Sequence, residues 1–183
     1  MDGKMKDRKL LNAELGRIKP EEYRAAKPSG LVLVLDNIRS AHNVGAAFRT
    51  ADAFRVDKLW LCGICDCPPS ALIHKSALGA EDSVPWAHCA DTLDAIRQLR
   101  AEGFVIIGVE QTCAAVSLEK FVPEAGKRYA FVFGNEVDGV AQEVVDACDG
   151  CVEIPQFGTK HSLNVSVSVG VVLWHAVNAI LNR

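Results

Sequence analysis

The stretch QFGTKHSLNVSVSVG, residues 156–170, decides how the C-terminal part of the chain folds. After Asn164, valines alternate with serines and a glycine, and a period of two is typical of a β-strand. The apolar segment continues with LWHAVNAILN, whose spacing fits a helix better. Because strands usually run about 5–6 residues, the length of the segment favours a single helix of about 19 residues over 164–182.

A helix at this position gives the small side chains a structural meaning. Ser166, Ser168 and Gly170 would allow neighbouring backbone to approach the helix closely. Ser162 precedes the helix, where a serine hydroxyl often caps the first N–H groups. The same serine belongs to a polar cluster with Lys160 and His161, and this position is equally compatible with a catalytic role. Both roles of Ser162 stay open on the sequence.

Upstream of this segment, apolar runs predict strands and periodic stretches predict helices. The predicted strands are residues 31–36, 58–63, 104–110, 129–134 and 151–155. The predicted helices are residues 43–54, 91–102 and 141–148, with one or two short helices within 7–27. The polar segment HKSALGAEDS, residues 74–83, is assigned to neither class. Strands that alternate with helices predict an α/β domain with a mainly parallel sheet and helices on both faces.

Polar loops follow four of the predicted strands. Their sequences are DNIRSAHN, GVEQT, GNEVDG and PQFGTKHSLN. Because the carboxyl ends of parallel strands meet at one edge of the sheet, we expect these loops to converge on one crevice.

The bulk composition is that of an ordinary globular chain. The sequence has 183 residues, of which 49% are hydrophobic and 23% charged, and its length fits one domain. The longest apolar run, near residues 165–181, is interrupted by serines, a histidine and an asparagine, so it is too polar for a membrane span. The N-terminal lysines are not followed by an apolar segment, so we expect no signal peptide and a cytoplasmic location.

Charge is distributed unevenly. Residues 1–28 carry a net charge of +3, so the remainder of this −3 chain is acidic. Lys27-Pro28-Ser29-Gly30 marks a boundary, which predicts a short basic helical arm at 1–28 and one domain at 29–183. A basic arm permits contact with nucleic acid, and a solvated helical arm is the alternative.

The seven cysteines allow a metal site but do not favour one. Cys62, Cys65 and Cys67 form C-x-x-C-x-C, and Cys148 and Cys151 form C-x-x-C. Such pairs can hold zinc, but the two groups are far apart in the sequence and lie partly in strand-like runs. We expect reduced thiols and no metal.

Familiar catalytic motifs are missing. The sequence has no G-x-G-x-x-G after a strand and no G-x-x-x-x-G-K-[ST], H-E-x-x-H or G-x-S-x-G. A hydrolase or a zinc enzyme is therefore not favoured.

Three other motifs occur in order along the chain. They are HNVGAAFRTADAF at 42–54, FGNEVDGV at 133–140 and IPQFGTKHSLNVSVSVG at 154–170. Together they resemble the SpoU/TrmH branch of the SPOUT superfamily, which consists of RNA ribose 2′-O-methyltransferases, over about residues 30–182. The resemblance implies a C-terminal trefoil knot, S-adenosylmethionine as methyl donor, a tRNA or rRNA substrate, and no metal. It also implies a homodimer with the knot and the last helix at the interface.

The same resemblance implies the catalytic residues, which are Asn43, Arg49, Glu136, Ser162 and Asn164. A guanidinium at Arg49 would fix a phosphate and favour the alkoxide electrostatically, because arginine stays protonated except in a special environment. Glu136 would order Asn43, Arg49 or substrate by hydrogen bonds, and its alternative is a charged turn residue. Asn43 and Arg49 are six residues apart on one helix, so they need not lie side by side, but both can face the crevice.

The residues expected at the methyl donor are Gly134, Ile154 and Leu163, with Val109 aligned more loosely. Residues 74–76 also resemble a family segment near the RNA, and a plain helix start is the alternative. Two other functions remain open, a non-catalytic RNA-binding or ribosome-assembly protein of this fold and a base-methylating SPOUT enzyme. The N-x-x-x-x-x-R pattern of Asn43 and Arg49 argues against base methylation.

Overall fold

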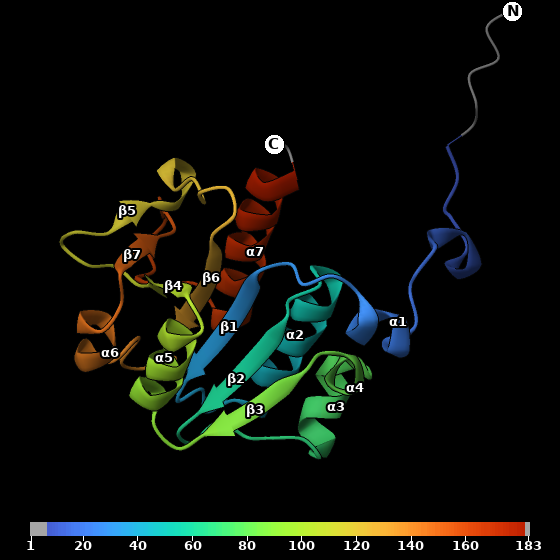
Figure 1. Cartoon of the computed structure of the whole chain (residues 1–183), viewed down its shortest axis with the longest axis horizontal. Coiled ribbons are helices and arrows are strands. Elements are labelled where there is room, and N and C mark those ends of the chain that lie inside the picture. Colours follow the sequence, from blue (N-terminus) through green and yellow to red (C-terminus); the bar gives the residue numbers. More distant parts are fainter. Residues whose placement is uncertain (1–6, 182–183) are drawn as a thin grey trace, which may run out of the picture.

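A computed structural model describes residues 7–181. The N-terminal part contains the short helices η1 (Asn12–Leu15) and α1 (Pro20–Ala25), which confirms the prediction for 7–27. Figure 1 shows the segment before α1 running away from the body of the molecule. Residues 1–6 of the predicted arm, and residues 182–183 at the other end, lie outside the described residues.

Seven strands form one sheet, and every pair of neighbours is parallel. They are β1 (Leu31–Asp36), β2 (Lys58–Cys62), β3 (Trp86–Cys89), β4 (Phe104–Val109), β5 (Val116–Ser117), β6 (Arg128–Phe133) and β7 (Gly150–Glu153). Their order is β3-β2-β1-β6-β4-β7-β5. The five predicted strands are confirmed, and the sequence analysis missed the short edge strands β3 and β5.

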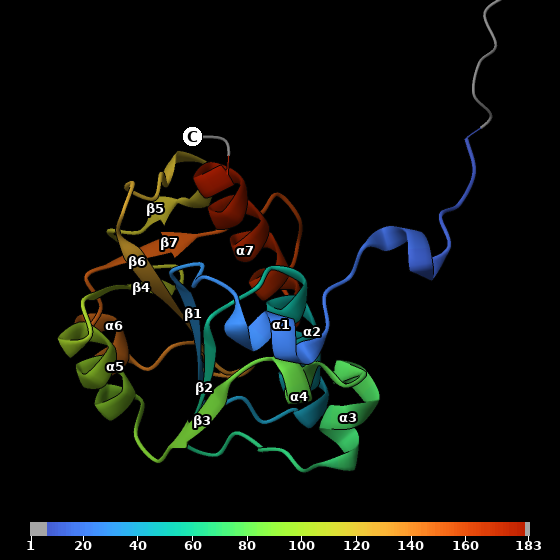
Figure 2. The ribbon, with the colours of Figure 1, turned by 45° about the vertical axis from the view of Figure 1, so that its right-hand side comes forward.

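Strand β1 shows why the sheet is covered on both faces. Every residue of LVLVLD is buried, as expected for a central parallel strand between two helical layers. Leu33 and Leu35 face the core with α2 (Ala41–Ala53), whereas Val32 and Val34 face the core with α5 (Thr92–Ala101). Figure 2 shows α2 and α7 (Val165–Leu181) on one side of the sheet, with α5 and α6 (Gln142–Asp146) on the other.

The segment 74–83 corrects the sequence analysis. It lies within two short helices, α3 (Ala71–Ala77) and α4 (Ala80–Ser83), separated by Leu78 in the left-handed region at φ 55°. These helices form because Ile73, Ala77 and Ala80 are buried against the core. His74 therefore lies inside a helix, and its Nδ1 is 2.5 Å from Glu81 Oε1, so this segment is not a helix start.

Helix α7 confirms the helical interpretation of the C-terminal segment. Its buried side consists of Val169, Val172, Leu173 and Ala176, and its exposed apolar residues are Val167, Val171, Trp174 and Ile180. Gly170 lies beside Thr50 of α2, where an added Cβ would make ordinary contact, so close packing explains little of the small-residue pattern.

Of the two roles left open for Ser162, the helix cap is excluded by the structure. Helix α7 begins at Val165, and Asn164 Oδ1 accepts from the Ser166 N–H at 2.9 Å and from the Ser166 hydroxyl at 2.6 Å. Asn164 thus occupies the capping position, and Ser162 lies too far before the helix to do so.

The structure also bears on two expectations from the sequence, the absence of a membrane span and the state of the cysteines. Among residues 7–181, no helix is both long and apolar enough to cross a bilayer. Burial raises the pKa of the Cys62 thiol to about 12 and that of Cys65 to about 11, which keeps both protonated. In the same part of the chain, no group of three or more His, Cys, Asp and Glu side chains is arranged to hold a metal ion.

Candidate active site

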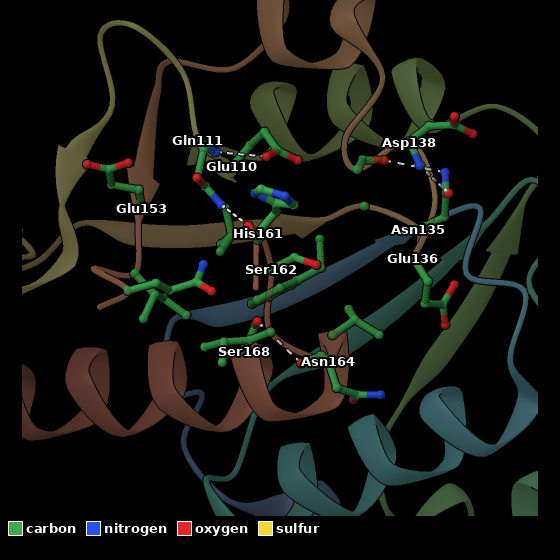
Figure 3. A pocket seen from close by; sticks show the side chains of 18 of the residues that line it. Glu110, Gln111, Asn135, Glu136, Asp138, Glu153, His161, Ser162, Asn164 and Ser168 are labelled. Atoms are coloured by element: carbon green, nitrogen blue, oxygen red, sulfur yellow. Dashed lines mark hydrogen bonds between the residues drawn. The ribbon is translucent and has the colours of Figure 1, made fainter. Parts of the chain in front are cut away.

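A cavity of about 520 Å³ lies where β4, β6 and β7 end and α7 begins. Its lining comes from residues 109–111, 133–139, 152–156 and 161–168 (Figure 3). Three of the four loops expected at this edge therefore converge. The fourth, which follows β1, reaches the cavity through Asn43 on α2.

One wall of the cavity is a tight turn at 134–140. Asn135 and Gly139 exchange backbone hydrogen bonds of 3.1 Å, and Asn135 Oδ1 accepts from the N–H groups of Val137 and Asp138 at 2.9 Å. A Cβ on Gly134 would overlap the backbone of Gly139 and Val140. Gly139 itself has φ 69°, a region that glycine enters without a Cβ penalty. The turn is fixed by its own hydrogen bonds and by the absence of two side chains.

This turn presents Glu136 to a hydrogen-bonded chain that joins all three motifs. Asn43 Nδ2 donates to Glu136 Oε1 at 2.6 Å, and Asn164 Nδ2 donates to Asn43 Oδ1 at 3.2 Å. Because Asn164 also caps α7, the start of that helix is fixed relative to α2 and the turn. Glu136 orders Asn43, as the sequence analysis proposed.

The first two residues of the loop after β4 have roles that the sequence did not predict. Glu110 Oε2 accepts from the Val140 N–H at 2.9 Å, and Glu110 Oε1 accepts from the Gln111 N–H at 2.8 Å. Gln111 Nε2 donates to the His161 carbonyl at 2.8 Å. Two consecutive residues at the end of β4 thus connect both walls of the cavity (Figure 3). Their position just after a buried strand was the available signal.

Arg49 does not join the other four expected catalytic residues. Six residues along a helix rotate the side chain to about 120° from Asn43, so the two point to different faces of α2. Arg49 is exposed, does not line the cavity, and makes no hydrogen bond or ion pair within residues 7–181. Within its own chain, Arg49 therefore does not face the cavity, although the sequence allowed both residues to do so. Another guanidinium lies nearer, since Arg39 is 3.9 Å from the Asp138 carboxylate at the cavity.

The remaining expected residues are at the cavity. Ser162 lines it and is exposed at the surface, and Leu163 beside it is 40% exposed. Gly134, Val109 and Ile154 line it as well. The carboxylates of Glu110, Glu136, Asp138 and Glu153 also belong to the lining, which favours a ligand that carries positive charge.

Comparison with known proteins identifies the family. The sequence model of the SpoU rRNA Methylase family matches residues 30–174. The chain belongs to the SpoU rRNA methylase family. The resemblance expected from the three motifs is thereby confirmed.

Individual relatives agree with this assignment. The chain is 37% identical over 143 residues to the 23S rRNA (guanosine-2′-O-)-methyltransferase RlmB of Neisseria meningitidis serogroup B, a match that covers 78% of this chain and 56% of the relative. It is 31% identical over 172 residues to the Vibrio vulnificus protein of the same name, with 89% and 68% covered. The chain thus spans little more than half the length of the first of these curated relatives.

Solved structures share the fold. The AdoMet-bound rRNA methyltransferase from Sinorhizobium meliloti superposes with a TM-score of 0.77 at 27% identity, covering 85% of this chain and 59% of that one. The A. aeolicus TrmH/SpoU tRNA modifying enzyme superposes with a TM-score of 0.76 at 26% identity, covering 87% and 79%. The predicted α/β fold with a parallel sheet is confirmed by the seven strands and by these neighbours.

Proposed function

We propose that this protein is an S-adenosylmethionine-dependent methyltransferase that acts on a ribose 2′-OH of rRNA or tRNA in the cytoplasm. The observation that carries the proposal is the hydrogen-bonded chain Asn164–Asn43–Glu136, which joins the three family motifs beside the cavity. The names of the RlmB relatives support ribose as the acceptor and favour rRNA.

The cavity fits the proposed methyl donor. Val109, Ile154 and Leu163 offer apolar surface for an adenine, and a volume of about 520 Å³ accommodates a molecule of this size. The carboxylates of the lining complement the ammonium and sulfonium charges of the donor. When bound, this cofactor supplies an electrophilic methyl group, and no metal is needed.

The polar residues beside the cavity would orient the acceptor. The amides of Asn43 and Asn164 each carry donor and acceptor groups suited to a ribose hydroxyl. Glu136 keeps the Asn43 amide in one orientation through the 2.6 Å hydrogen bond. Ser162 Oγ does not cap α7, so it is available to accept a hydrogen bond from the 2′-OH and orient that hydroxyl toward the methyl donor.

A homodimer through α7 would give Arg49 a role. Exposed apolar residues line one side of α7, and Trp174 packs against Phe54 of α2 with ring centroids 6.3 Å apart. Burying this surface against a second copy would remove a large apolar area from water. Arg49 lies next to Thr50, which is beside Gly170 of α7, so its guanidinium would be near the interface and could bind phosphate at the partner's cavity.

We also propose a trefoil knot and the two-part organisation of the chain. The chain leaves β7 beyond β4 and returns to pack α7 against α2, and Gln111 contacts the returning segment at His161. This path supports threading past the loop after β4. Residues 29–183 would form the catalytic domain, and the arm at 1–28 or the dimer groove would supply further RNA contacts.

One experiment tests the chemistry. The protein is incubated with methyl-labelled S-adenosylmethionine and RNA from a strain lacking its gene, and the digested nucleosides are identified by mass spectrometry. A 2′-O-methyl nucleoside is the expected product, and Asn164→Ala should abolish it. A base-methylated nucleoside, or donor binding without any transfer, would overturn the proposal.

A further inference from the structure

Phe157 is an unusual feature of the loop that links β7 to α7. Its exposed fraction is 96%, whereas the other phenylalanines of the described chain are buried or half-buried. The whole segment 156–164 is exposed. A fully solvated aromatic ring on a loop makes no contribution to the core, so its surface is free to contact a ligand.

The loop is placed at the rim of the cavity. Gln156 and His161 line the cavity, and the His161 carbonyl is held by Gln111 Nε2. Residues on both sides of Phe157 therefore border the proposed active site, while the Phe157 ring is exposed to solvent. Phe157 directly follows Gln156, a residue of the cavity lining, so a ligand that extends beyond the cavity can reach its ring.

This loop differs in charge from the other residues that line the cavity. The lining of the cavity carries the carboxylates of Glu110, Glu136, Asp138 and Glu153. Residues 156–164 contain Lys160 and His161 and no acidic residue. The phosphates of a polyanion would be repelled by these carboxylates and attracted to the cationic side chains of the loop. The loop is therefore the favourable place for phosphates.

We propose that residues 156–161 form a ledge for single-stranded RNA. On it Phe157 stacks against a nucleobase that neighbours the methylated nucleotide, and Lys160 pairs with a phosphate. Bases in loops and single strands are commonly stacked on aromatic side chains, and such stacking tolerates any sequence. This inference rests on the proposed function, because it takes RNA as the substrate.

The test compares Phe157→Ala with Phe157→Trp and the wild type. Replacing a stacking aromatic with alanine should raise the KM for RNA about tenfold, and tryptophan should restore it. Affinity for S-adenosylmethionine, measured by calorimetry, should not change in either variant. Lys160→Ala should weaken RNA binding and lessen its dependence on salt. Val122→Ala is the control, since Val122 is 61% exposed and does not line the cavity.

Other outcomes would overturn the ledge. An unchanged KM for RNA in Phe157→Ala excludes stacking. Loss of donor affinity would assign Phe157 to the donor cavity, and a shift from dimer to monomer in sedimentation would assign it to contact with a second copy. RNA affinity measured by fluorescence anisotropy keeps the test independent of catalysis. If the wild type binds RNA without methylating it, the proposed function fails, while a difference between the two Phe157 variants would still support the ledge.

Discussion

The two walls of the cavity are built in opposite ways. The turn 134–140 is fixed by hydrogen bonds to Asn135, by a left-handed glycine and by the Glu110 carboxylate. Of the hydrogen bonds within residues 7–181, the loop 156–163 receives one from another segment, between Gln111 and His161. The wall formed by the turn carries Glu136, which holds the Asn43 amide, and the looser wall carries the residues proposed to bind RNA.

Cutting the hydrogen-bonded chain at its centre should give the largest effect. Asn43→Ala removes the amide that donates to Glu136 and that accepts from Asn164. The side chains of Glu136 and Asn164 then lose a partner that orients them. We expect the rate of methyl transfer to fall roughly 100-fold, as when a positioned polar group is lost from an active site. Single-turnover rates measure this loss. Asn12→Ala in η1 is the control, and an equal loss there would argue against a specific role.

The rigid wall should not tolerate a methyl group that the loose wall accepts. Gly139→Ala puts a Cβ at φ 69° and against the Glu110 carboxylate, which should lower the free energy of unfolding by about 1–3 kcal/mol. Gly158→Ala in the loop meets nothing within 4 Å and should change it by less than about 0.5 kcal/mol. Denaturant titration measures both. Similar values for the two variants would contradict the contrast between the walls.

Glu110 tests how the rigid wall is attached to β4. In Glu110→Gln, an amide NH₂ replaces one acceptor, so either the Val140 or the Gln111 N–H loses its partner. We expect affinity for S-adenosylmethionine to fall about tenfold, which corresponds to about 1.4 kcal/mol. Calorimetry measures this affinity, and Glu143→Gln at an exposed position of α6 is the control. Unchanged affinity would show that the turn holds itself without Glu110.

The smallest effect is expected for the loose wall. Gln111→Ala removes a hydrogen bond whose net contribution is about 1 kcal/mol. Amide hydrogen exchange in 156–163 should accelerate a few-fold, while the melting temperature changes little. Gln98→Ala, which removes a comparable amide contact within α5, should leave exchange in the loop as it was. Slow exchange in both variants would mean that the loop is fixed by other contacts.

The elements missed from the sequence share a physical cause. Strand β3 has four half-exposed or exposed residues, and β5 has two residues, so neither carries a buried apolar run. Helices α3 and α4 are too short to show a helical period in a polar segment, and Ile73 and Ala77 are buried there because α2 lies beside them. Tertiary contact, rather than local pattern, creates these elements.

The sequence by itself determined the parallel α/β sheet, the long C-terminal helix and the family. Apolar runs and the three motifs are properties of residues that are neighbours along the chain, so they can be recognised without the structure. The sequence named Asn43 as one of three possible partners of Glu136, and the structure shows the hydrogen bond between them. Only the tertiary structure decided that Asn164 rather than Ser162 caps α7, and that Arg49 lies outside the cavity of its own chain. It alone revealed Glu110 and Gln111 as the connection between the walls. These outcomes depend on where a helix begins and which face of it meets a distant loop, and long-range packing sets both.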